Sequence, residues 1–306
     1  MGRTLSAELI GAYIEDYCGG NPLALDSLSF SESDDFSTIG ASAFSGLKAL
    51  KAVYLPEGVT DLGEGCFSDC SALRSIILPS TLRHISARAF QGCQSLTDVV
   101  LPSHLEALGD GAFEDCVNLI RVRLSRRITE IKPSTFAKCK SLEEVSGYKK
   151  LVLIGEEAFD GCESLSEFTF PEGLTEIADY AFYGCKSLKK LKLPNSLLKI
   201  GDSAFHFCCS LREFIAPPKL YSIGDEAFSD CYRLKKVEYN HGLNRIGNCA
   251  FSTCALSRQP ELPDSLSRDC RLFRLYEYNP FVYPRLIWRL KAKADLRKGH
   301  RPRIFY

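Results

Sequence analysis

The sequence lacks any apolar run long enough to cross a bilayer. No stretch reaches the eighteen or more consecutive apolar residues that a spanning helix needs. The first thirty residues also lack the basic start, the apolar core and the small-residue cleavage site of a secretory signal. These absences predict a cytoplasmic protein.

Recognisable catalytic and cofactor motifs are missing as well. The sequence contains no P-loop, no G-x-G-x-x-G and no G-x-S-x-G. Its histidines occupy unrelated positions of the chain, without an evident nucleophile and orienting carboxylate beside them. No second cysteine or histidine pair stands near Cys66 and Cys70 at zinc-ligand spacing. We therefore expect no enzymatic activity, no cofactor and no bound metal ion.

The chain has no net charge, with 38 basic and 38 acidic side chains, but the two signs are unevenly distributed. Residues 1–36 carry one Lys or Arg and seven Asp or Glu, whereas residues 267–306 carry eleven and three. The two ends of the chain are therefore oppositely charged. No recognised module for reading DNA or RNA accompanies the basic end, so nucleic acid is the weakest candidate partner.

Cysteine, by contrast, is abundant, with fourteen in 306 residues. In a small secreted protein this number would indicate a disulfide framework, but this chain is long and 45% hydrophobic, which favours reduced thiols around a core. Nine of the cysteines recur at a spacing of 23 residues: Cys70, Cys93, Cys116, Cys139, Cys162, Cys185, Cys208, Cys231 and Cys254. A whole column in one phase is a structural feature, not a set of catalytic residues.

Other apolar residues keep the same 23-residue period. Each cysteine stands three residues after a phenylalanine, and Leu47 fills the cysteine position in the first repeat. The phenylalanines are Phe44, Phe67, Phe90, Phe113, Phe136, Phe159, Phe182, Phe205, Phe228 and Phe251. The consensus of one repeat is I-G-x-x-A-F-x-x-C-x-x-L-x-x-V-x-L-P-x-x-L. A fixed period of this length indicates a repeat architecture.

The order of residues within a repeat predicts its local structure. The alternation in L-x-x-V-x-L is typical of a short strand buried on one face, and the proline after it ends the strand. The x-x-A-F-x-x-C stretch fits a single turn of helix or 3₁₀ structure. One unit cannot bury its own apolar face, but stacked units can. We predict a mainly β solenoid of about ten coils, classed as α/β, with helical caps at both ends.

These columns resemble the BspA-type leucine-rich repeats, a 23-residue class found in surface and other proteins of bacteria and protists. The resemblance covers about residues 37–266 and implies a leucine-rich-repeat solenoid. Family members are often exported adhesion or interaction proteins, so the resemblance also implies a role as a surface adhesin if an export signal precedes this sequence. One repeat departs from the pattern, with Gly147-Tyr148 where Leu-Pro is expected. We expect a local bulge or an altered edge there.

The repeat array divides the chain into three expected parts. Residues 1–36 form an N-terminal helical cap and a degenerate first coil, residues 37–266 form the solenoid, and residues 267–306 form an aromatic C-terminal cap with a basic helix. Ser6 is placed to cap a helix that Gly19-Gly20 would end. The apolar face of that helix would be Leu9, Ile10, Tyr13, Ile14 and Tyr17.

The solvent-facing strand positions are the expected binding surface, because successive coils align them in columns. Tyr54, Ile77 and Val100 form an apolar strip that meets Arg121 and Arg123, and Lys190 and Lys192 extend the same columns. Exposed apolar residues beside arginine are common at protein interfaces. The alternative is that β-branched and aromatic residues simply favour strands. The sequence thus predicts a non-enzymatic scaffold for a protein partner.

The basic C-terminal segment supports a second hypothesis. Its charged face would carry Arg285, Arg289, Lys291, Lys293, Arg297 and Lys298. This face could be simply solvated, lie on an anionic membrane surface, or bind an acidic partner. A further alternative is head-to-tail self-association with the acidic end of another copy. The start Met1-Gly2 with Ser6 also fits a myristoylation pattern, which would add a second membrane signal.

Overall fold

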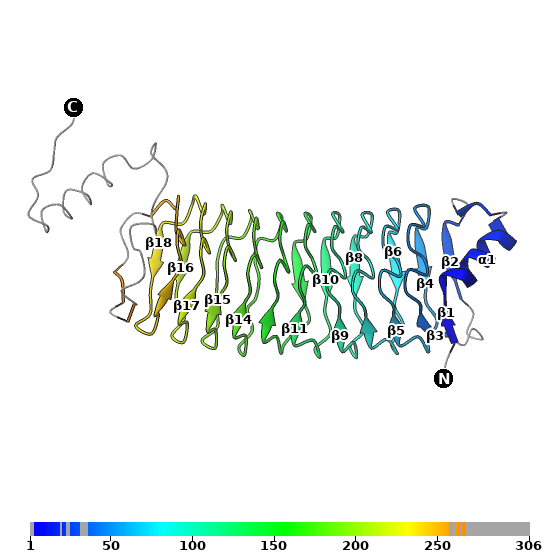
Figure 1. Cartoon of the computed structure of the whole chain (residues 1–306), viewed down its shortest axis with the longest axis horizontal. Helices are drawn as coiled ribbons and strands as arrows, with labels where there is room; N and C mark the ends of the chain where they lie inside the picture. Colours follow the sequence, from blue (N-terminus) through cyan, green and yellow to red (C-terminus); the bar gives the residue numbers. More distant parts are fainter. Residues whose placement is uncertain are drawn as a thin grey trace, which may run out of the picture.

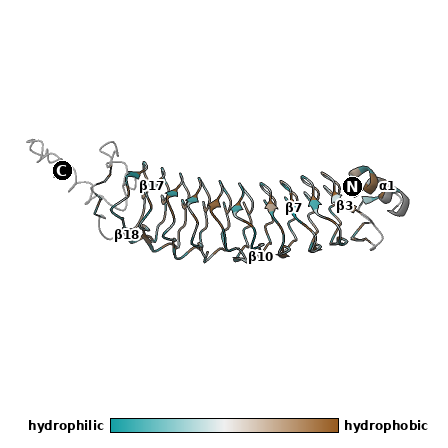
Figure 2. Ribbon diagram, turned by 90° about the horizontal axis from the view of Figure 1, so that it is seen from below, coloured by the Kyte–Doolittle hydropathy of each residue, from teal (hydrophilic) through white to brown (hydrophobic). Residues whose placement is uncertain are grey.

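The structure is a computed structural model, and it describes residues 3–18, 20–22, 25–30, 36–256, 261–263 and 265–266. The chain winds into successive coils that lie side by side in one elongated row (Figure 1). Figure 2 shows the same row from a second direction, with helix α1 at its N-terminal end. The predicted solenoid is thus confirmed, and the strands of neighbouring coils pair in parallel.

The first sheet face is formed by the L-x-x-V-x-L segments of most coils, and the middle residue of each strand points inward. The strands of this face are β2 (Ser27–Ser29), β4 (Ala52–Tyr54), β6 (Ser75–Ile77), β8 (Asp98–Val100), β10 (Arg121–Arg123), β12 (Glu144–Ser146), β16 (Glu213–Ile215) and β18 (Lys236–Glu238). They form the groups β2-β4-β6, β8-β10-β12 and β16-β18. In β10, for example, Val122 is buried between exposed arginines.

A second sheet face, absent from the sequence prediction, runs along the isoleucine column. Its strands are β1 (Arg3–Leu5), β3 (Phe36–Ile39), β5 (Asp61–Leu62), β7 (His84–Ile85), β9 (Ala107–Leu108), β11 (Glu130–Ile131), β13 (Leu153–Ile154), β14 (Glu176–Ile177), β15 (Lys199–Ile200), β17 (Ser222–Ile223) and β19 (Arg245–Ile246). Most of these strands have two residues, too few to show an alternating pattern in the sequence. Their pairing nevertheless places Ile131, Ile154 and Ile177 in one buried row.

The expected helical turn at x-x-A-F-x-x-C is instead a series of tight turns, which we call the turn edge. Within it, some N–H groups donate three residues back, as Leu47 does to Phe44. The alternate N–H groups donate to the next coil, as Ser42 and Phe44 do to Glu64 and Cys66. Residues two before and two after each phenylalanine have positive φ. Two left-handed residues thus flank each phenylalanine, and every second N–H group along this edge donates to the following coil.

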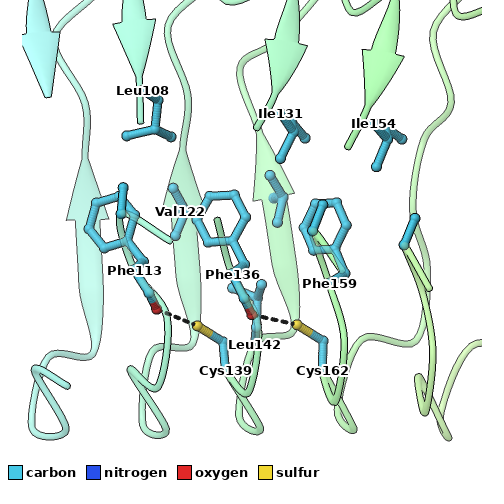
Figure 3. Close-up of a cluster of buried hydrophobic side chains, with 14 of the residues drawn as sticks. Leu108, Phe113, Val122, Ile131, Phe136, Cys139, Leu142, Ile154, Phe159 and Cys162 are labelled. Carbon is cyan, nitrogen blue, oxygen red and sulfur yellow. Dashed lines mark hydrogen bonds between the residues drawn. The ribbon is translucent and has the colours of Figure 1, made fainter. Parts of the chain in front are cut away.

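The core consists of the repeated columns predicted from the sequence. From Phe44 to Phe251, the rings of successive coils are stacked with centroids 4.8–5.7 Å apart. Figure 3 shows the rings of Phe113, Phe136 and Phe159 side by side. Burying each such side chain contributes about 1.5–3 kcal/mol before entropy is counted. Cys66, which stands where most repeats have alanine, is buried as expected.

The cysteine column has a specific hydrogen-bonding partner. Each column thiol donates to the phenylalanine carbonyl of the preceding coil, and the Sγ–O distances lie between 3.0 and 3.3 Å. Two of these bonds, from Cys139 and Cys162, are drawn in Figure 3. The column thiols are not joined in disulfides, and burial raises the pKa of most of them, to about 12 for Cys70. The column therefore ties neighbouring coils together without disulfides.

The N-terminal helix forms as predicted and covers the first coils. Helix α1 spans Ala7–Cys18, and the Leu9 N–H donates to Ser6 Oγ at 3.5 Å. The Gly20 N–H donates to the Ile14 carbonyl at 3.1 Å, with a φ of 74°. Ile10 is buried and Ile14 half-buried, but Leu9 is exposed, which corrects the predicted apolar face. The side chains of Tyr13 and Tyr17 lie outside the described structure.

Two coils lack the strand that the pattern predicts for the first face. No strand is assigned at residues 167–169 or 190–192, between β12 and β16. Gly147 has a φ of 90°, and the Tyr148 hydroxyl donates to the Thr169 carbonyl at 2.7 Å. The rings of Tyr148 and Phe168 stack at 5.4 Å, and Phe170 packs against Phe168. The altered edge expected at Gly147-Tyr148 is thus present, and it interrupts the first face.

Candidate functional site

The candidate site is the solvent-exposed side of the first sheet face, in the N-terminal half of the solenoid. Strand β4 places Tyr54 opposite Ile77 of β6, and β8 places Val100 opposite Arg123 of β10. Tyr54 is 47% exposed, Ile77 57% and Val100 67%. One face of these strands packs on the core, and the other face, which carries these three side chains, is open to solvent. We call Tyr54, Ile77, Val100, Arg121 and Arg123 the strand-face patch.

The two arginines of the patch differ in their partners. Arg121 Nη2 lies 2.8 Å from Asp98 Oδ1, the residue opposite it on β8. Both side chains are exposed, and such a surface pair contributes little to stability. Arg123 makes no ion pair within 4.0 Å among the described residues. Arg123 is therefore the freer of the two guanidinium groups to meet a carboxylate of a partner.

The remaining predicted site residues are not brought to this patch. Lys190 and Lys192 are exposed in one of the coils without a first-face strand, beyond β12. The strand-face patch and the two lysines are thus separated by the interruption at Gly147-Tyr148. Arg285, Arg289, Lys291, Lys293, Arg297, Lys298 and Gly2 lie outside the described residues.

The structure places two histidines beside carboxylates. The sequence analysis did not identify these two pairs. His84 Nδ1 lies 2.7 Å from Asp61 Oδ1, and His206 Nε2 lies 2.9 Å from Asp230 Oδ2. Both pairs join coils 23 or 24 residues apart, a separation that a 23-residue repeat turns into contact. The periodicity was the signal that could have found them.

These pairs are not accompanied by an activated nucleophile. Cys208, two residues after His206, is buried, and the half-buried Cys209 donates through its Sγ to the Phe207 carbonyl at 3.2 Å. Burial raises the pKa of Cys209, although Lys186 opposes this effect. A nucleophilic cysteine needs a lowered pKa. No cluster of three or more potential metal ligands occurs in the described part of the chain.

A helix able to span a membrane does not occur among the residues that the structure describes. Several exposed ion pairs join neighbouring coils, such as Lys199 with Glu176 at 2.7 Å. The 23-residue repeat brings the two residues of such a pair into contact.

The parallel ladders and the buried leucine, isoleucine and phenylalanine columns define a leucine-rich-repeat solenoid. The chain belongs to the family described as BspA type leucine rich repeat region, whose model matches residues 12–143 and 129–258. The resemblance predicted from the 23-residue consensus is confirmed. None of the curated proteins matches the chain.

Several solved structures of bacterial leucine-rich repeat proteins are similar to this chain. The leucine-rich repeat protein of T. pallidum is 27% identical, with a TM-score of 0.45, and the match covers 61% of this chain and 78% of that one. A leucine-rich repeat protein from Bacteroides ovatus is 23% identical, with a TM-score of 0.33 and coverages of 78% and 88%. One from Eubacterium ventriosum is 19% identical, with a TM-score of 0.48 and coverages of 80% and 81%.

Proposed function

We propose that this protein is a non-enzymatic scaffold that binds a protein partner through the strand-face patch. The observation that carries the proposal is the alignment of three exposed apolar side chains, Tyr54, Ile77 and Val100, beside Arg123. Protein interfaces combine an apolar centre with aromatic residues and arginine. The membership of the chain in a family of repeat scaffolds supports an interaction role.

The patch has the character of a binding surface because it does not contribute to the core. Val53, Val99 and Val122, the inward residues of β4, β8 and β10, make the buried contacts of these strands. Replacing their outward neighbours should therefore leave the fold intact. A partner would gain by covering Tyr54 and Ile77, because each square ångström of apolar surface removed from water contributes about 25 cal/mol.

The test is a triple variant of the full chain, Tyr54→Ser with Ile77→Ser and Arg123→Ser. Proteins that co-purify with the wild-type chain from its native source would be identified, and the binding of each measured with purified components by calorimetry. We expect the triple variant to lose at least one partner, with a dissociation constant raised about a hundredfold or more, because hot-spot residues each contribute about 2 kcal/mol.

The matched control is Ile215→Ser, which removes an equally exposed β-branched residue from β16, outside the patch. This variant should bind as the wild type does. If the triple variant retains every interaction of the wild-type chain, the strand-face patch is not the binding surface.

The alternative function is attachment to an anionic membrane or partner by the C-terminal basic segment. It is supported by the eleven basic and three acidic residues of 267–306. Flotation of the full chain with phosphatidylserine vesicles distinguishes the two functions. Salt-sensitive binding that disappears after Arg285→Glu, Arg289→Glu and Lys293→Glu would support this alternative. Binding of less than about a tenth of the protein at low salt would exclude attachment to the membrane.

A further inference from the structure

The turn edge of the solenoid carries an aromatic cluster in its C-terminal half. The cluster consists of Tyr180, Tyr183, His206 and Phe207, which come from two neighbouring coils. The same positions hold small, polar or charged residues in the N-terminal coils, for example Ser45, Gly46 and Ser68. This cluster is separate from the strand-face patch, since none of its residues belongs to a strand.

The rings of the cluster contact one another near the surface. Tyr183 lies edge-on to His206 and Phe207, with centroids 5.2 and 5.7 Å apart. His206 and Phe207 stack at 4.4 Å, and Tyr180 lies 5.9 Å from Tyr183. Tyr180 is 41% exposed, and Tyr183 and Phe207 are half-buried. Aromatic surface is therefore presented to solvent and not to the core.

Two of these rings stand at backbone positions that disfavour them. Tyr180 has a φ of 55° and Phe207 a φ of 57°. In other coils glycine occupies the position equivalent to Phe207, as at Gly92 and Gly161, and serine occupies that of Tyr180, as at Ser134. A bulky side chain at positive φ costs conformational energy, and such strain is concentrated at functional sites. The fold itself does not need aromatic residues here.

Carboxylates surround the cluster. Asp230 accepts from His206 at 2.9 Å, and Glu226 Oε2 lies 3.7 Å from His206 Nδ1. Burial raises the pKa of Tyr183, and the negative charges of Asp160 and Asp230 add to this effect. Two of the nearby cations already have partners, since Lys138 pairs with Glu114 at 2.9 Å and Lys186 with Glu163 at 3.1 Å. The cluster is therefore a negatively charged aromatic surface.

We infer that the turn-edge aromatic cluster binds an arginine side chain in an extended segment of a partner protein. The guanidinium group stacks on aromatic faces and pairs with carboxylates in a bidentate manner. The cluster offers both, with Tyr180, Tyr183 and Phe207 as faces and Glu226 and Asp160 as carboxylates. Charge complementarity thus selects a basic partner at this edge, independently of what the strand-face patch binds.

The experiment measures binding of a fluorescein-labelled peptide with three Gly-Ser-Arg repeats to the full chain, by fluorescence anisotropy at low salt. A peptide with citrulline at the three arginine positions tests the charge, since citrulline keeps the shape without it. We expect the arginine peptide to bind at least about tenfold more tightly than the citrulline peptide. A peptide with lysine at these positions should lie between them.

The site is tested by the double variant Tyr183→Ser with Phe207→Gly, which installs residues that other coils carry in the same columns. We expect its affinity for the arginine peptide to fall about tenfold. Its midpoint of chemical unfolding should not fall, because glycine relieves the positive φ. The variant Ile215→Ser is the matched control, and it should bind the peptide as the wild type does.

Three results would overturn the inference. The first is absence of peptide binding to the wild-type chain, or equal binding of the citrulline peptide. The second is unchanged affinity in the double variant. The third is a more than about tenfold gain in peptide affinity after Arg285→Glu and Arg289→Glu. That gain would show that the C-terminal segment of this chain, and not a partner, occupies the cluster.

Discussion

At the scale of single residues, the cysteine column shows how much of the interior follows from periodicity alone. The 23-residue spacing predicts that the thiols are buried together beside the phenylalanines, and they are. It does not reveal the acceptor, because this depends on the direction of the phenylalanine carbonyl in the turn. The Phe90 carbonyl, for example, already accepts the Cys93 N–H of its own coil, and the Cys116 thiol of the following coil donates to it as a second partner.

Replacing one column cysteine tests this hydrogen bond. We expect Cys139→Ala to lower the free energy of unfolding by about 1–2 kcal/mol, because it leaves a small cavity and removes one of the two hydrogen bonds that the Phe113 carbonyl accepts. Cys139→Ser keeps a donor of similar size, so it should cost less. Chemical denaturation of the three proteins measures the difference. Equal stability of the alanine variant and the wild type would show that the thiol bond contributes nothing.

The same burial predicts a pattern of thiol reactivity. Burial raises the pKa of Cys70 to about 12, so neither exposure nor ionisation favours its alkylation near pH 8. Among the cysteines whose side chains the structure describes, Cys209 and Cys249 are half-buried and should react first. Mass spectrometry after brief iodoacetamide treatment locates the modified sites. Rapid modification of Cys116 or Cys162 in the native protein would contradict the described core.

At the scale of elements, the sequence predicts the inward and outward residues of each strand but not where strands are lost. The alternation in L-x-x-V-x-L correctly places Val122 inside and Arg123 outside. The same alternation holds in the coils of Phe168 and Leu191, where no strand forms. Bulky rings at Tyr148, Phe168 and Phe170 occupy the space and change the edge, an effect of packing between coils that no single repeat contains.

Gly147 is the element-scale test of this interruption. A Cβ added there would lie close to the Leu124 carbonyl oxygen, and the φ of 90° already disfavours a side chain. We expect Gly147→Ala to cost about 2–4 kcal/mol. Gly173 has a φ of 102° but nothing near its Cβ direction, so Gly173→Ala carries only the conformational cost. Equal losses in the two variants would exclude the steric clash at Gly147.

At the scale of the whole molecule, all coils have the same length, so one whole coil can be removed without shifting the repeated columns. Deleting residues 85–107 removes one 23-residue unit and keeps every column in phase. We expect this shortened chain to fold with native-like circular dichroism and to be about 4.8 Å shorter in small-angle scattering. Deleting residues 85–96 instead puts the phenylalanine column out of phase, and that chain should not fold. Similar behaviour of the two deletions would contradict an additive solenoid.

The alternating turn edge gives the molecule a direction. The inter-coil N–H groups of this edge, such as those of Ser42 and Phe44, point toward the next coil, so the two ends of the row are chemically different. At one end β1 and α1 already occupy the first position, and Gly40 donates to the Leu5 carbonyl there. The row of coils therefore has a chemical polarity along its long axis. An extended ligand that spans several coils meets a different sequence of groups in each orientation, and only one orientation can match.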